Sequence, residues 1–208
     1  MSPRMNTYIG RARVVDFLDH HVAHDIVQEL TRKRILVTHH ITDEQSTYSC
    51  VPSCGYNSAM VAAKMAARQS NWMNINLSDC CDKTPQNSAS EPHNTMLELG
   101  DIHLGYPPPH NGRYLSSSEL SRLFEFYSEL FYAERYNQEQ RRRFVEWAFD
   151  RATFLRHMRA HITARQSKGE GCPLHICILN TMATSPGSHW ITVAYEMTPV
   201  TMAIEHET

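Results

Sequence analysis

The sequence predicts an α+β fold with helices first and a small antiparallel sheet last, and three observations lead to this class. Before residue 165, most apolar residues recur at three- and four-residue spacings, the period of amphipathic helices. After residue 172, they are mainly β-branched or aromatic, as in strands. Hydrophobic residues make up 41% of the 208 residues and charged residues 20%, so the chain has enough apolar side chains for a buried core.

The first third of the chain predicts a helix, a strand and a second helix. Residues 12–31 carry an apolar stripe at helical spacing and predict an amphipathic helix. A short strand is expected at ILVTHH, which begins at Ile35. Residues 57–69 are rich in Ala and Met, which suits a helix packed closely on two sides. Cys54 falls at the N-terminal end of that helix.

The middle of the chain predicts a polar loop followed by a helical insertion. Residues 74–115 are dominated by Asn, Ser, Asp, Pro and Gly, and a structureless stretch of this length is expected to be a surface excursion. Residues 116–165 contain two apolar stripes, the first capped by Ser116–Ser118 and the second running from Phe144 to Ile162. We expect these two segments to form an antiparallel helical pair.

The C-terminal part predicts the sheet. Residues 174–180 and 189–196 form strand-like runs, and a third run follows a turn at Thr198–Pro199. A hairpin at that turn would bring residues 205–208 opposite His189. The chain has no internal repeat and no low-complexity segment, so residues 1–208 are expected to form a single domain.

Charge and hydropathy exclude several classes of partner. The 20 basic and 22 acidic residues give a net charge of -2, which argues against a nucleic-acid or anionic-membrane surface based on bulk charge. No run approaches the roughly 20 apolar residues of a membrane span, and the N-terminal residues hold no apolar run that could serve as a secretory signal. We therefore expect a cytoplasmic chain, or one delivered without a Sec-type signal peptide, whose partner is a protein or peptide substrate. The oligomeric state is left open.

The chemistry of the chain is expected at one cysteine and one histidine. Cys54 begins a helix, whose positive end lowers the pKa of a thiol and so favours the nucleophilic thiolate. Gly55, next to it, allows close approach of a substrate backbone. His189 heads a strand and supplies a general base, and Trp190 can shield the pair from water.

A third group is needed to orient the imidazole of His189. Only three acids follow His189 in the sequence. Glu196 lies an odd number of residues along the same strand and points to the opposite face. The expected hairpin places Glu205 and Glu207 on one face opposite His189, so either could orient the ring, and Glu205 is preferred.

The segments SCGYNSAMVAA, around Cys54, and GSHWITVAY, around His189, resemble the papain-like cysteine peptidases. The resemblance is in particular to the branch that includes the double-glycine leader peptidases and their relatives. This resemblance implies a papain-like fold, in which the helix of the catalytic cysteine packs on a C-terminal antiparallel sheet. It also implies that Cys54 is the nucleophile, His189 the base and Glu205 the acid of a catalytic triad.

The oxyanion hole departs from the pattern of this family. Its members usually carry a glutamine six residues before the cysteine, where this chain has Tyr48. Gln45 lies nine residues before Cys54. Either a longer loop lets Gln45 donate, or the hole is formed by the Cys54 backbone N–H and another donor such as Asn57.

The expected function is that of a papain-like thiol hydrolase acting on a peptide, isopeptide or side-chain amide bond of a protein, with no cofactor. The same acyl-enzyme could instead serve glutamine deamidation, transglutamination or acyl transfer on a partner protein. A third alternative is a catalytically inactive binding module. Cys50 and Cys54 have the spacing of half a zinc site, but no second pair with a familiar spacing completes it, so no metal site is expected.

Overall fold

The computed structural model describes residues 7–16, 21–41, 53–68, 71–77, 92–110, 112–132, 145–148, 151–181 and 189–200. Their elements, in chain order, are β1 (Thr7–Asp16), α1 (His21–Arg32), β2 (Ile35–Ile41), α3 (Cys54–Ala67), the 3₁₀ turn η1 (Trp72–Asn74), α4 (Pro92–Leu104), α5 (Ser117–Tyr132), β3 (Val145–Ala148), α7 (Arg151–Ser167), β4 (Cys172–Asn180) and β5 (Trp190–Val200).

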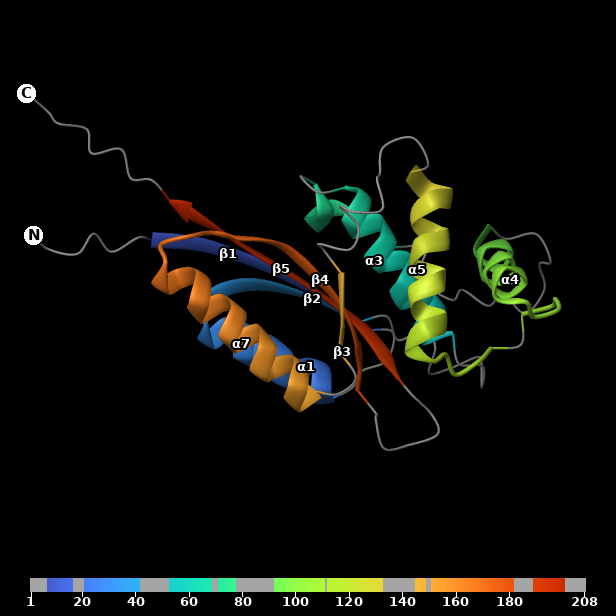
Figure 1. The fold of residues 1–208 in the computed structure, drawn as a ribbon, viewed down its shortest axis with the longest axis horizontal. Coiled ribbons are helices and arrows are strands. Elements are labelled where there is room, and N and C mark those ends of the chain that lie inside the picture. Colours follow the sequence, from blue (N-terminus) through green and yellow to red (C-terminus); the bar gives the residue numbers. More distant parts are fainter. Residues whose placement is uncertain are drawn as a thin grey trace, which may run out of the picture.

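A five-stranded mixed sheet of order β2-β1-β5-β4-β3 forms the centre of the fold (Figure 1). β5 is antiparallel to both of its neighbours, β1 and β4. The two outer pairs, β1 with β2 and β3 with β4, are parallel. Parallel neighbours need a crossover connection, and α1 and α7 lie between the strands of these two pairs in the chain. The predicted α+β class is confirmed, but the expected order of helices first and an antiparallel sheet last is wrong, because the sheet is mixed and its strand β1 is the first element of the chain.

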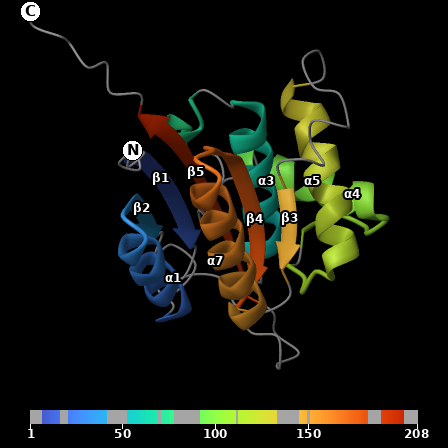
Figure 2. The same ribbon diagram turned by 60° about the vertical axis from the view of Figure 1, so that its left-hand side comes forward.

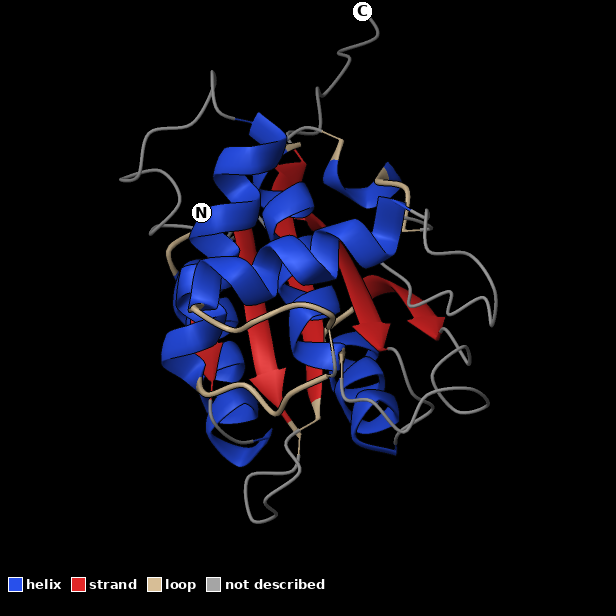
Figure 3. Ribbon diagram, turned by 90° about the vertical axis from the view of Figure 1, so that its right-hand side faces the viewer, coloured by secondary structure: helices blue, strands red, loops and turns tan. Residues whose placement is uncertain are grey.

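Helices cover the two faces of the sheet separately. α1 and α7 contact each other and pack on one face, in front of the strands in Figure 2. α3 lies on the other face against β4 and β5, and α5 packs on α3 from outside, with α4 beside it (Figure 3). Every residue from Cys54 to Ala66 is buried, which explains why α3 is rich in small and apolar residues such as Ala and Met. Within the described ranges, no helix is long and apolar enough to cross a membrane.

The predicted helix at residues 12–31 is wrong in its first part. Residues 12–16 belong to β1, and the helix begins only at His21. Val15 is buried in the core on the α3 side, whereas Ala12 and Val14 are buried in the core on the α1–α7 side. A strand buried on both faces has a nearly continuous apolar run, which fits a helical pattern as well as a strand pattern.

The predicted antiparallel helical pair at residues 116–165 is also wrong. Its first helix is present as α5, but residues 145–148 form β3, and the second helix begins at Arg151. α5 packs on α3, whereas α7 packs on the opposite face of the sheet. An apolar stripe tells which side of a helix is buried, but not which element covers it.

The polar stretch at residues 74–115 is not free of secondary structure. It contains α4, whose Leu97 is buried in the core on the α3 side. Gly100 of α4 packs so tightly that a Cβ there would lie 2.5 Å from the hydroxyl of Tyr127. The apolar residues of this helix do not form one stripe at helical spacing, so the helix does not stand out from the polar composition around it.

The predicted hairpin at Thr198–Pro199 does not form. β5 runs through both residues to Val200. Thr198 and Pro199 pair with Ile9 and Tyr8 of β1. Near its His189 end, β5 is already flanked by β1 and β4, so neither edge is open to a further strand.

Candidate active site

The start of α3 is fixed against the start of β5 by two hydrogen bonds. The hydroxyl of Ser58 donates to the carbonyl of Trp190 at 3.0 Å, and the hydroxyl of Thr192 donates to the carbonyl of Ser58 at 3.1 Å. All of these groups are buried, where such bonds are stronger than in water. Cys54, one turn before Ser58, is thereby held beside His189, the residue before β5.

His189 lies between a thiol and a carboxylate. Its Nε2 is 2.7 Å from Oδ1 of Asp16, the last residue of β1, and its ring also hydrogen-bonds the side chain of Cys54. Asp16 is fully buried, and Cys54 and His189 are 5% and 4% exposed. The His189 carbonyl accepts a hydrogen bond from the backbone N–H of Thr181 at 2.8 Å, which fixes the main chain behind the ring.

The surroundings of His189 favour its protonated form. Burial alone would lower the pKa of the imidazole, but the hydrogen bonds to Asp16 and Cys54 and the charges of both groups raise it to about 9. The ring is therefore an imidazolium at neutral pH. An imidazolium next to a cysteine at a helix N-terminus stabilises the thiolate, so the geometry suits a reactive thiolate–imidazolium pair.

The structure brings together Cys54 and His189, the two residues that sequence reasoning paired. It does not bring Glu205 or Glu207 into view, because both lie outside the described residues. The predicted hairpin that was to deliver them is absent, and Asp16 occupies the Nε2 side of the ring instead. Sequence reasoning missed Asp16 because it considered only acids that follow His189. The available signal was a single acid at the end of the apolar run RVVD.

The two candidate oxyanion donors have different outcomes. Gln45 lies outside the described residues, so its role stays a prediction. Asn57 lies in the first turn of α3 and is fully buried, and neither its side-chain nitrogen nor its oxygen has a hydrogen-bond partner within the described part of the chain. Helical side chains lean toward the N-terminus, here toward Cys54. A buried amide without partners costs free energy, which calls for a functional explanation.

Gly55 has a different role from the predicted one. A Cβ at this position would lie 2.9 Å from Cδ1 of Leu115, so the missing side chain makes room for Leu115 and not for a substrate backbone. Trp190, expected to shield the pair, is buried in the core on the α3 side.

A buried polar cluster connects Tyr56 of α3 to the loop that follows α4. We define this Asp101 cluster as Tyr56, Asp101, His110 and Arg113. The Tyr56 hydroxyl donates to Asp101 Oδ1 at 2.5 Å, His110 Nδ1 lies 2.7 Å from Oδ2, and Arg113 Nε lies 3.4 Å from Oδ1. Burial, followed by the hydrogen bond and charge of Asp101, raises the pKa of Tyr56, so this group stays a neutral donor. The cluster fixes the loop beside the nucleophile.

Comparison with known proteins assigns no family. No protein-family model matches the chain, and no curated protein and no solved structure is significantly similar to it. Among the residues with described positions, no group of three or more His, Cys, Asp or Glu side chains is arranged to hold a metal ion. The chemistry of the site must therefore be argued from its own geometry.

Proposed function

We propose that this chain is a papain-like thiol hydrolase that cleaves an amide bond of a protein or peptide substrate. The observation that carries the proposal is the position of His189, whose ring bonds the Cys54 side chain and the Asp16 carboxylate at once. Nucleophile, base and orienting acid in contact are the parts that acyl transfer by a cysteine requires.

In the first half of the reaction, the Cys54 thiolate attacks the amide carbonyl carbon, and a sulfur–carbon bond forms. Protonated His189 gives its proton to the leaving amine as the carbon–nitrogen bond breaks. In the second half, neutral His189 takes a proton from water, the resulting hydroxide attacks the thioester, and the carboxylic acid leaves as the Cys54 thiolate is restored. Asp16 holds the ring through Nε2, which leaves Nδ1 to exchange the proton, and stabilises the imidazolium without taking a proton itself.

The developing oxyanion is stabilised by the start of α3. The backbone N–H of Cys54 lies at the N-terminus of α3, where the helix dipole favours negative charge. We assign the second donor to the amide of Asn57, because its nitrogen is buried and has no partner among the described residues. This assignment gives a function to an otherwise costly side chain.

Thiol mapping tests the proposal. The chain is treated briefly with iodoacetamide near pH 7, and the modified cysteines are identified by mass spectrometry. Cys54 should react first, whereas Cys172, whose pKa is raised to about 11 by burial, should react last and serves as the internal control. Equal rates at Cys54 and Cys172 would overturn the proposal.

The type of reaction is read from products. A library of N-acetylated peptides is incubated with the wild-type chain and with Cys54→Ala, with and without a primary amine. Backbone fragments indicate hydrolysis, a gain of about 1 Da without fragments indicates side-chain deamidation, and an amine adduct indicates acyl transfer, since the same acyl-enzyme serves all three. Products that also form with Cys54→Ala would argue against any role of this thiol.

A further inference from the structure

The segment Gly112–Leu115 packs through Leu115 on Gly55, the residue that follows the proposed nucleophile. The side chain of Leu115 fills the space over Gly55, where a Cβ would meet its Cδ1, Cγ and Cβ at 2.9, 3.3 and 3.4 Å. Leu115 is 3% exposed, so this contact is part of the core. The residues adjacent to Leu115 in the sequence therefore lie in the neighbourhood of Cys54.

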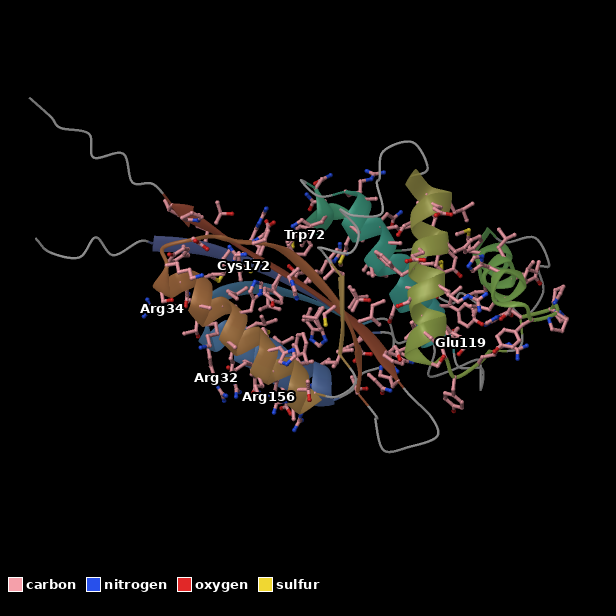
Figure 4. The ribbon with its side chains drawn as sticks, viewed as in Figure 1. Arg32, Arg34, Trp72, Glu119, Arg156 and Cys172 are labelled. Atoms are coloured by element: carbon pink, nitrogen blue, oxygen red, sulfur yellow. The ribbon has the colours of Figure 1, made fainter. Side chains whose placement is uncertain are left out.

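This segment is held firmly at its two ends. At the first end, the Arg113 guanidinium lies 3.8 Å from the centre of the Tyr106 ring and joins the Asp101 cluster. At the second end, Ser116 and Glu119 form a capping box. The hydroxyl and the N–H of Ser116 donate to Glu119 at 2.7 and 2.8 Å (Glu119 is labelled in Figure 4). A segment fixed in this way presents its exposed groups with little conformational freedom.

Between these anchors, the segment offers groups that have no partner among the residues that the structure describes. Residues 113–116 are half-buried, exposed, buried and exposed in turn, the alternation of an extended chain, so Tyr114 points away from α3. Its side chain is 59% exposed, unusually high for a large aromatic residue. The backbone N–H and C=O groups of Gly112–Leu115 make no hydrogen bond with one another or with the other described residues.

We propose that Tyr114 is a specificity-determining residue, which packs against an apolar side chain of an extended polypeptide substrate next to the scissile amide. The inference rests on the proposed function and adds the substrate class to it. An extended chain can satisfy the unpaired backbone groups of Gly112–Leu115 while it places one side chain on the tyrosine ring. A rigid aromatic side chain supplies contact area at low entropic cost, and an acidic side chain would lose hydration there without gaining a partner.

Affinity labels built on short peptides test this inference. Three tripeptidyl chloromethyl ketones carry Phe at the first, second or third residue from the ketone, with Gly elsewhere, and a matched set carries Asp. In each case the Cys54 sulfur displaces chloride, so a sulfur–carbon bond forms and the carbon–chlorine bond breaks. The rate of labelling is followed against probe concentration, which separates the half-saturating concentration from the limiting rate.

With the wild-type chain, one Phe probe should label Cys54 about tenfold faster than its Asp counterpart at low concentration. Tyr114→Ala should raise the half-saturating concentration of that probe by about the same factor and leave its limiting rate unchanged, and Tyr114→Phe should retain the preference. Leu36→Ala, which removes a 71% exposed apolar residue from the edge strand β2, is the matched control and should change nothing.

Two results would overturn the inference about Tyr114 alone, and a third would overturn the proposed function as well. No preference for Phe in the wild-type chain, or an unchanged preference in Tyr114→Ala, removes Tyr114 from substrate recognition. Iodoacetamide is too small to reach Tyr114, so its rate at Cys54 should be equal in all variants and also reports that they are folded. If iodoacetamide itself fails to select Cys54, the proposed function fails, and this inference fails with it.

Discussion

Two cysteine–histidine contacts within the described part of the chain lie on different elements and differ in what surrounds them. Cys54 begins α3 and meets a histidine that is bonded to a buried carboxylate. Cys172 begins β4, in the layer between α7 and the sheet (Figure 4), with its sulfur 3.7 Å from both ring nitrogens of His161. His161 Nδ1 is 3.1 Å from the hydroxyl of Tyr195, a neutral group.

The difference shows that contact with a histidine does not by itself make a cysteine reactive. Burial raises the pKa of Cys172 to about 11, so this residue is a thiol at neutral pH. It lies in a strand and not at a helix N-terminus, and the group that meets Nδ1 of His161 is a tyrosine hydroxyl and not a carboxylate. At Cys54, a helix start and the Asp16–His189 pair are present together.

The largest effect is expected on stability at high pH. The pKa of His189 is about 9 in the folded chain against about 6.5 when unfolded, so its stabilising contribution is complete below pH 6.5 and is lost as the pH rises through 9. The loss is on the order of 3 kcal/mol. Urea unfolding at pH 6 and pH 10 measures it as the difference between the wild-type chain and His189→Asn. Parallel pH profiles of the two would contradict the raised pKa.

Removing the histidine from each pair should affect only one of the cysteines. In His189→Ala, the rate of Cys54 alkylation at pH 7 should fall more than about tenfold, because the imidazolium that favours the nucleophilic thiolate is lost. In His161→Ala, the slow rate at Cys172 should stay within about twofold, since no ion pair is lost. A similar fall at both cysteines would mean that the two contacts are equivalent.

Removing the carboxylate should have a smaller effect. Asp16→Asn keeps an oxygen that can accept from His189 but removes the charge that favours the imidazolium. Cys54 alkylation at pH 7 should therefore fall only about two- to threefold, because a modest fall in the pKa of His189 from about 9 leaves most of the ring protonated at that pH. Glu205→Gln is the matched variant, because sequence reasoning gave this role to Glu205, and it should leave the rate within about twofold. The opposite result for the two variants would return the role to Glu205.

The contrast between Asp16 and Glu205 shows which part of the site a sequence can reveal. Cys54 and His189 could be predicted because each carries a local signal, a helix start in one case and the head of a strand in the other. Asp16 could not be predicted, because it reaches His189 only through the antiparallel pairing of β1 with β5. The two residues are 173 positions apart in the chain. The sequence also suggested a hairpin partner for β5 that would have left β1 out of the sheet.

In the fold, too, some features could be predicted from local sequence and others could not. α3, α5, β2 and β4 were predictable, because each has the periodicity or composition of its own element. The side of the sheet on which α7 lies was not predictable. The helix has a buried stripe of Phe154, Met158 and Ile162, but a stripe does not show which surface covers it. Local pattern therefore specified elements, and long-range pairing specified both the layers and the third residue of the site.

The smallest effect is expected from the contact that holds α3 on the sheet, compared with a similar bond on the other face. Ser58→Ala removes a buried donor to the Trp190 carbonyl and should cost about 1 kcal/mol of unfolding free energy. Ser167→Ala removes a bond to the Ala164 carbonyl at the exposed end of α7 and should cost only a few tenths of a kcal/mol, since water replaces the lost donor. Urea unfolding at pH 7 measures both.

Because Ser58 lies one turn after Cys54, its variant should also slow Cys54 alkylation, whereas Ser167→Ala should not. Equal losses in the two variants, with no change in the alkylation rate, would show that these bonds do not position the nucleophile.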